Sequence, residues 1–84
     1  MTKPLFTASL IVPQGYVCQF KVYSAGLRFW EFINENLGLS ILLFYVHDVG
    51  YFGSLMPGAG NEIQKDNLIC QAVFELEEFY RKRH

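Results

Sequence analysis

The sequence predicts an α+β fold with the element order β-β-α-β-β-α: a four-stranded, mainly antiparallel sheet with two helices packed on one face. Four short segments have the apolar patterns of strands, and two longer ones combine capping residues with apolar residues at helical spacing. The chain has 84 residues, which suffice for one hydrophobic core and are too few for two. We therefore expect a single domain, residues 1–84.

Composition excludes some classes of function. Apolar residues make up 51% of the chain, charged residues only 18%, and the net charge is −1. A chain this close to neutrality offers no basic field for phosphates and no acidic field for cations. We expect no nucleic-acid partner.

The N-terminal segment predicts a hairpin. Over residues 6–12, apolar residues such as Ala8 and Leu10 alternate with polar ones, which is typical of a half-buried strand. Pro13-Gln14-Gly15 has the residues of a tight turn. A second alternating segment, residues 16–23, follows as the returning strand.

A helix is expected over residues 25–37. Ser24 can cap its first turn, and Gly38 can take the left-handed conformation at its end. Its apolar residues, Phe29, Trp30 and Phe32 among them, spread over about 160° of a helical wheel, wider than the roughly 100° stripe that faces one core. The excess predicts a second contact surface.

The second half repeats the order of the first. Residues 41–46 are apolar on both sides, as in a strand covered above and below. A turn at residues 47–50 leads to a fourth strand, residues 51–56, although Gly53 weakens that assignment. After the loop at residues 57–60, we expect a helix over 67–82, with an alternative start near 62.

We expect neither a membrane-spanning segment nor a secretory signal peptide. The longest apolar stretch, residues 37–46, is far shorter than the roughly 20 residues of a membrane span, and residues 5–12 are too short for a signal peptide. Cys18 and Cys70 lack the spacing of a zinc site. We expect a cytoplasmic protein with two buried, reduced cysteines and no membrane partner.

No motif identifies a reaction. His47-Asp48 can be an acid/base pair but is better explained as a polar turn. Glu75, Glu77 and Glu78 fan out around the last helix and have basic residues one turn later, as on a solvated face. The glycine-containing turns lack the spacing of phosphate-binding loops. We expect no catalytic residues, no cofactor and no metal.

The leading hypothesis is a non-enzymatic protein-interaction module, a homodimer that can also bind another protein. The chain has more apolar surface than four strands and two helices can bury among themselves, and Phe74 falls among charged residues on its helical wheel. The candidate interface residues are Ile11, Val17, Tyr23, Phe29, Trp30, Phe32 and Phe74.

Two alternatives remain open. One is a carrier of a small apolar ligand or a minor enzyme, with a pocket lined by Trp30, Tyr45, His47, Asp48, Tyr51 and Phe52. The other is an inhibitor or immunity-type protein of a mobile element, since such chains are compact and lack catalytic motifs.

Overall fold

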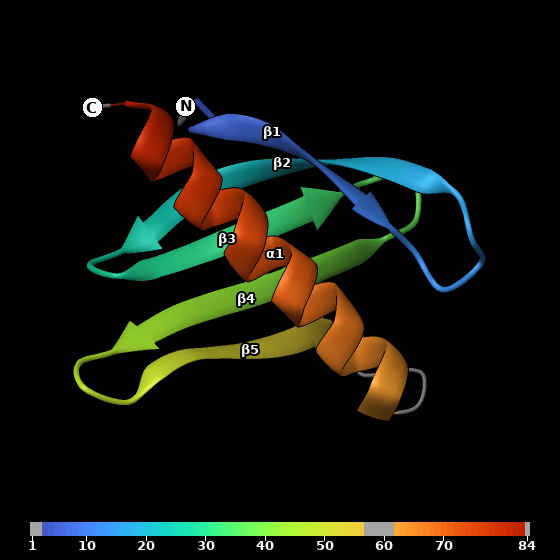
Figure 1. Ribbon diagram of the computed structural model, residues 1–84. Coiled ribbons are helices and arrows are strands. Elements are labelled where there is room, and N and C mark those ends of the chain that lie inside the picture. Colours follow the sequence, from blue (N-terminus) through green and yellow to red (C-terminus); the bar gives the residue numbers. More distant parts are fainter. Residues whose placement is uncertain (1–2, 57–61, 84) are drawn as a thin grey trace.

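The structure, a computed structural model, describes residues 3–56 and 62–83, in which a five-stranded antiparallel sheet is followed by one helix (Figure 1). The strands are β1 (Phe6–Ile11), β2 (Val17–Gly26), β3 (Phe29–Asn34), β4 (Leu39–Val46) and β5 (Gly50–Met56), and the helix is α1 (Glu62–Lys82). Each strand pairs with its neighbours in sequence. The α+β class with an antiparallel sheet is confirmed, whereas the four-stranded sheet with two helices is wrong.

The predicted helix at residues 25–37 is replaced by strand β3. Its sequence, FWEFIN, is rich in aromatic residues, which favour strands over helices. Trp30 and Phe32 point into the core, whereas Phe29 lies on the opposite face with 36% exposure. The apolar residues of this segment spread widely on a helical wheel because they lie on both faces of a strand.

The two residues assigned as helix caps have other roles. Ser24 continues β2 and pairs with Trp30 across the β2–β3 ladder. Gly38 has a φ of 62° and ends the turn between β3 and β4, where its N–H donates to the carbonyl of Glu35. A glycine at this position satisfies a tight strand turn as well as a helix end, because both need a positive φ.

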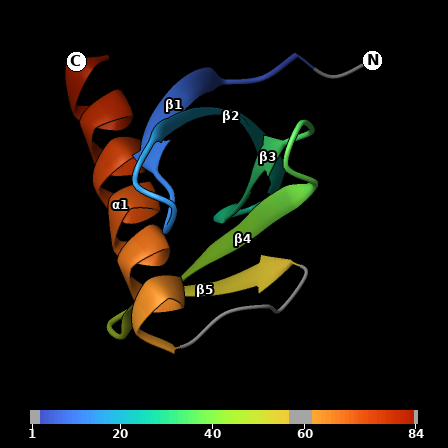
Figure 2. The same ribbon diagram turned by 90° about the vertical axis from the view of Figure 1, so that its right-hand side faces the viewer.

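The core lies between one face of the sheet and α1. Figure 2 shows that the sheet is strongly curved and that α1 lies across its open side, where it contacts β1, β4 and β5. The largest fully buried side chains come from every strand except β5, from the residue after β1 and from α1, namely Leu10, Val12, Phe20, Val22, Phe32, Ile41, Leu43, Leu68 and Leu76.

One apolar stripe of α1 faces the sheet. Leu68, Ala72 and Leu76 recur every four residues and are almost completely buried, as expected for the core-facing stripe of an amphipathic helix. Near the C-terminal end, Phe79 stacks on Phe6 with ring centroids 4.4 Å apart. The predicted C-terminal helix is confirmed, with the earlier of the two starts considered.

Gly53 allows β5 to approach α1 closely. A Cβ atom at Gly53 would lie 2.8 Å from Cγ1 and Cγ2 of Ile69, and the branched isoleucine has little rotamer freedom to move away. We expect Gly53→Ala to lower the free energy of unfolding by about 1–2 kcal/mol, the net of overpacking and a smaller entropic gain. Urea denaturation measures the change.

Ser54 supplies the matched control, because it is exposed on the other face of the same strand. Ser54→Ala is expected to change the free energy of unfolding by less than about 0.5 kcal/mol. A Gly53→Ala variant as stable as the wild type would show that β5 and α1 are not in close contact.

Candidate protein interface on the outer sheet face

The sheet has a core face and an outer face, and no described element covers the outer face. Alternate residues of each strand point to opposite faces, so the residues between the core positions lie outside. Figure 2 shows α1 on one side of the curved sheet only. The apolar side chains of the outer face are therefore open to solvent or to a partner.

Three phenylalanines form a continuous row across this face. The strand register places Phe29 opposite Phe44 and Phe44 opposite Phe52. Their ring centroids are 6.2 Å and 5.6 Å apart, and the three side chains are 36%, 38% and 44% exposed. Neighbouring rings at such distances attract one another. We call this row, Phe29, Phe44 and Phe52, the aromatic ridge.

The outer face is divided into an apolar and a polar half. Exposed Val46 and Met56 lie on the same face of β4 and β5 as the aromatic ridge. Over the middle of β1 and β2 the face is polar, and there Gln19 Nε2 donates to Ser9 Oγ at 2.9 Å. Exposed Ile11 and Val17 lie beyond this polar part, at the far end of the two strands. An apolar surface bounded by polar residues is typical of a protein interface.

The predicted interface residues fall into three groups. Phe29 belongs to the aromatic ridge, and Tyr23 is half-buried on the same face. Exposed Ile11 and Val17 pair with each other at the diagonally opposite corner of the sheet, and exposed Phe74 lies on α1. Trp30 and Phe32 are buried in the core and offer no surface to a partner.

Sequence reasoning missed Phe44, Val46 and Met56 as interface residues. Residues 41–46 are apolar on both sides, and this pattern predicted a strand covered on both faces. The cover is present on the core face alone, since Phe44 and Val46 are each 38% exposed. The sequence signal for the aromatic ridge is a strand with apolar residues on both sides. The structure adds that only one of these sides is covered.

Three of the predicted ligand-binding residues gather at one end of the core. The ring centroids of Trp30 and Tyr51 are 6.1 Å apart, and those of Tyr45 and Tyr51 are 5.0 Å apart. Tyr80 of α1 joins them, because Trp30 Nε1 donates to its hydroxyl oxygen at 3.1 Å. These side chains pack against one another and link α1 to the sheet.

The other three predicted ligand-binding residues lie elsewhere. His47 and Asp48 are exposed in the turn between β4 and β5, with His47 Nε2 3.5 Å from Asp48 Oδ2. Phe52 belongs to the aromatic ridge on the outer face. The structure therefore brings together three of the six residues and separates them from the rest.

The hydroxyl of Tyr51 titrates at higher pH than an ordinary tyrosine. Burial, and next to it the charge of Glu77, raises the pKa of Tyr51, because both disfavour the phenolate. A pKa raised by folding contributes stability that is complete below the unfolded pKa of about 10 and is lost as the pH rises through the folded pKa.

We expect the wild type to lose stability above about pH 10 more steeply than Tyr51→Phe, which has no group to ionise at this position. Urea midpoints at neutral and alkaline pH measure the difference. The same loss of stability in both proteins would contradict this assignment.

The described residues show no metal centre. No group of three or more histidine, cysteine, aspartate or glutamate residues within 3–56 and 62–83 could hold an ion. Both cysteines are free; Cys18 is buried as predicted, but Cys70 is exposed, so that part of the expectation is wrong. Within the same ranges, no helix has the length and apolar character needed to cross a membrane.

Comparison with known proteins gives no relative, because the chain matches no protein-family model, no curated protein and no solved structure. On the chain's own surface, the aromatic ridge is the row of contacting, exposed rings on the uncovered sheet face.

Proposed function

We propose that the protein is a non-enzymatic, cytoplasmic protein-interaction module that forms a symmetric homodimer through the aromatic ridge. The main support for this proposal is the row of exposed rings on the outer sheet face, which no described element covers. Aromatic side chains contribute most to protein interfaces when they lie at the centre and are fully desolvated on binding. A free, exposed Cys70 fits a reducing compartment.

A second copy is the occupant that fits the ridge best. The ridge is a row of like, uncharged side chains, so it can pack against itself across a two-fold axis. The net charge of −1 causes little repulsion between copies. Lys21 and Glu31 lie on the same face beside the apolar half, and a two-fold axis can bring the lysine of one copy near the glutamate of the other.

Sedimentation equilibrium of the wild type over a dilution series tests the proposal. We expect a mass of twice 9.7 kDa at tens of micromolar and a fall toward the monomer mass on dilution. A mass of 9.7 kDa at every concentration would refute the dimer.

A further inference from the structure

The first strand of the sheet has an open edge that faces α1. The N–H of Val12 donates to the carbonyl of Tyr16 across the hairpin at 3.1 Å. In this register the even-numbered residues of β1 bond to β2, and the odd-numbered ones point away from it. The backbone groups of Thr7, Ser9 and Ile11 therefore face outward, as a template for another strand.

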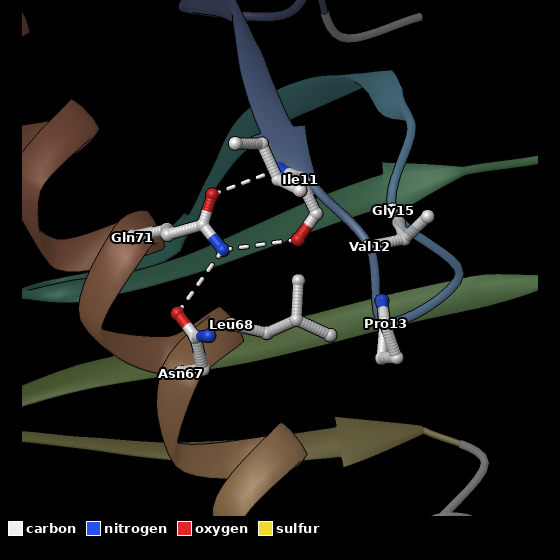
Figure 3. Close-up of a pocket in the computed structure, with 7 residues that line it drawn as sticks. All are labelled: Ile11, Val12, Pro13, Gly15, Asn67, Leu68 and Gln71. Atoms are coloured by element: carbon white, nitrogen blue, oxygen red, sulfur yellow. Dashed lines mark hydrogen bonds between the residues drawn. The ribbon is translucent and has the colours of Figure 1, made fainter.

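One residue of α1 already forms hydrogen bonds with part of this edge. Figure 3 shows the side-chain amide of Gln71 at the backbone of Ile11. Its Oε1 accepts from the Ile11 N–H at 2.8 Å, and its Nε2 donates to the Ile11 carbonyl at 3.0 Å. This is the exchange of two hydrogen bonds that a residue of a neighbouring strand would make. Among the described residues, no side chain does the same for Thr7 or Ser9.

A groove runs along the seam between β1 and α1. It consists of three adjoining hollows of about 580, 270 and 510 Å³. The first lies at the β1–β2 turn beside Gln71, the second between Ser9 and Phe74, and the third between Thr7 and Phe74. Gln71 lines the first two and Phe74 the last two, so each hollow adjoins the next. We call them the β1–α1 groove.

The helical wall of this groove includes an exposed apolar residue and, next to it, an acidic one. Phe74 is 61% exposed, although it is one turn from the residue that binds Ile11. Next to it, Glu75 is half-buried and forms no ion pair or hydrogen bond with another described residue. Further along, in the third hollow, Glu78 is already paired with Arg81, and Lys82 also lines this hollow. In the second hollow, which has no basic residue among its described lining residues, Glu75 is thus an unpaired carboxylate that a basic partner can reach.

We propose that the β1–α1 groove binds an extended peptide segment that adds to the sheet beside β1. The backbone of the segment pairs with Thr7 and Ser9, as in other complexes formed by strand addition. An apolar side chain of the segment packs on Phe74, and a basic one pairs with Glu75. This site is separate from the aromatic ridge and binds whether or not the protein dimerises.

A second copy of this chain is a poor occupant of the groove. Antiparallel pairing of β1 with its own copy would bring the two Glu75 carboxylates toward each other, and like charges at short distance are repelled. The Gln71 amides would also compete for the Ile11 groups that such a pairing needs. A foreign basic segment meets neither obstacle.

The test is an NMR titration of ¹⁵N-labelled protein with pools of blocked, proline-free hexapeptides. Each pool holds arginine, leucine or glutamate at one fixed position and is otherwise randomised. We expect the arginine and leucine pools to shift the amide signals of Thr7 and Ser9, and the glutamate pools to have little effect. Absence of these shifts with every pool, or shifts confined to the aromatic ridge, would overturn the proposal.

Three variants sharpen the test, each measured with the most tightly binding pool. Gln71→Ala frees the edge at Ile11 and is expected to bind several-fold more tightly, a gain that misfolding cannot mimic. Glu75→Lys is expected to bind about tenfold more weakly. Glu35→Lys makes the same charge change in the exposed β3–β4 turn and should leave binding unchanged. Equal affinity of all three would refute the groove as the site.

The titration is repeated with Phe44→Asp, a change in the aromatic ridge. We expect the same shifts at Thr7 and Ser9 in this background, so that failure of the dimer and failure of the groove are seen separately. Loss of the peptide shifts in a folded Phe44→Asp protein would contradict a separate site.

Discussion

Phe32→Ala is expected to lower the free energy of unfolding by about 3–5 kcal/mol. Phe32 is fully buried, pairs with Val22 and Ile41 on the neighbouring strands, and lies at the centre of the core. Its removal leaves a cavity that the paired strands cannot close. Urea denaturation at low micromolar concentration, where dimerisation contributes least, measures the loss.

Phe29→Ala is the matched control, since it makes the same chemical change three residues away on the outer face. We expect a loss of less than about 1.5 kcal/mol, because Phe29 is already partly exposed. A helix over residues 25–37 would bury both rings on one stripe. Equal losses from the two variants would therefore contradict strand β3.

Phe44→Asp is expected to weaken the dimer at least about thirtyfold, the effect of losing a central interface residue worth about 2 kcal/mol. Phe44 is the middle ring of the aromatic ridge and contacts the other two. The variant removes this ring and places a carboxylate where a partner would exclude water. The dissociation constant from sedimentation equilibrium measures the change.

Phe74→Asp makes the same change at an exposed phenylalanine of α1, away from the outer sheet face. We expect the dimer of this variant to be as stable as that of the wild type. Dissociation caused by Phe74→Asp, or a tight dimer of Phe44→Asp, would move the interface from the sheet to the helix.

Much of the fold follows from local patterns. Alternation of apolar and polar residues, with few exceptions, and the Pro13–Gly15 turn predict the first hairpin. The four-residue spacing of Leu68, Ala72 and Leu76 predicts α1. β3 could not be assigned in this way. Its six residues are too few to separate a helical from a strand period, and the flanking Ser24 and Gly38 have the chemistry of helix caps as well as of strand turns.

The candidate site was predicted in part. The excess of apolar residues indicated an uncovered surface, and Phe29 was among the residues named for it. Phe44 was not, because the side chains of a strand that is apolar on both sides do not show which face lacks a cover. Which face lacks a cover depends on the side of the sheet to which the helix packs, and local patterns do not show this contact between distant segments.

Sequence patterns could not predict the free edge of β1 either. Strand order decides which strand is left without a neighbour, and order depends on contacts between distant segments. Gln71, sixty positions from Ile11 in sequence, has no local feature that indicates its role. Phe74 did stand out, because it is a large apolar residue on the charged side of the helix.

If the protein is a dimer through the aromatic ridge, two copies of the chain touch at its three rings. An isotope-filtered NOE experiment on labelled and unlabelled protein, mixed equally and refolded together, detects contacts between copies alone. We predict such contacts from the rings of Phe29, Phe44 and Phe52. Signals between copies that come from Phe74 and not from these three rings, or no such signals at all, would contradict an interface on the outer sheet face.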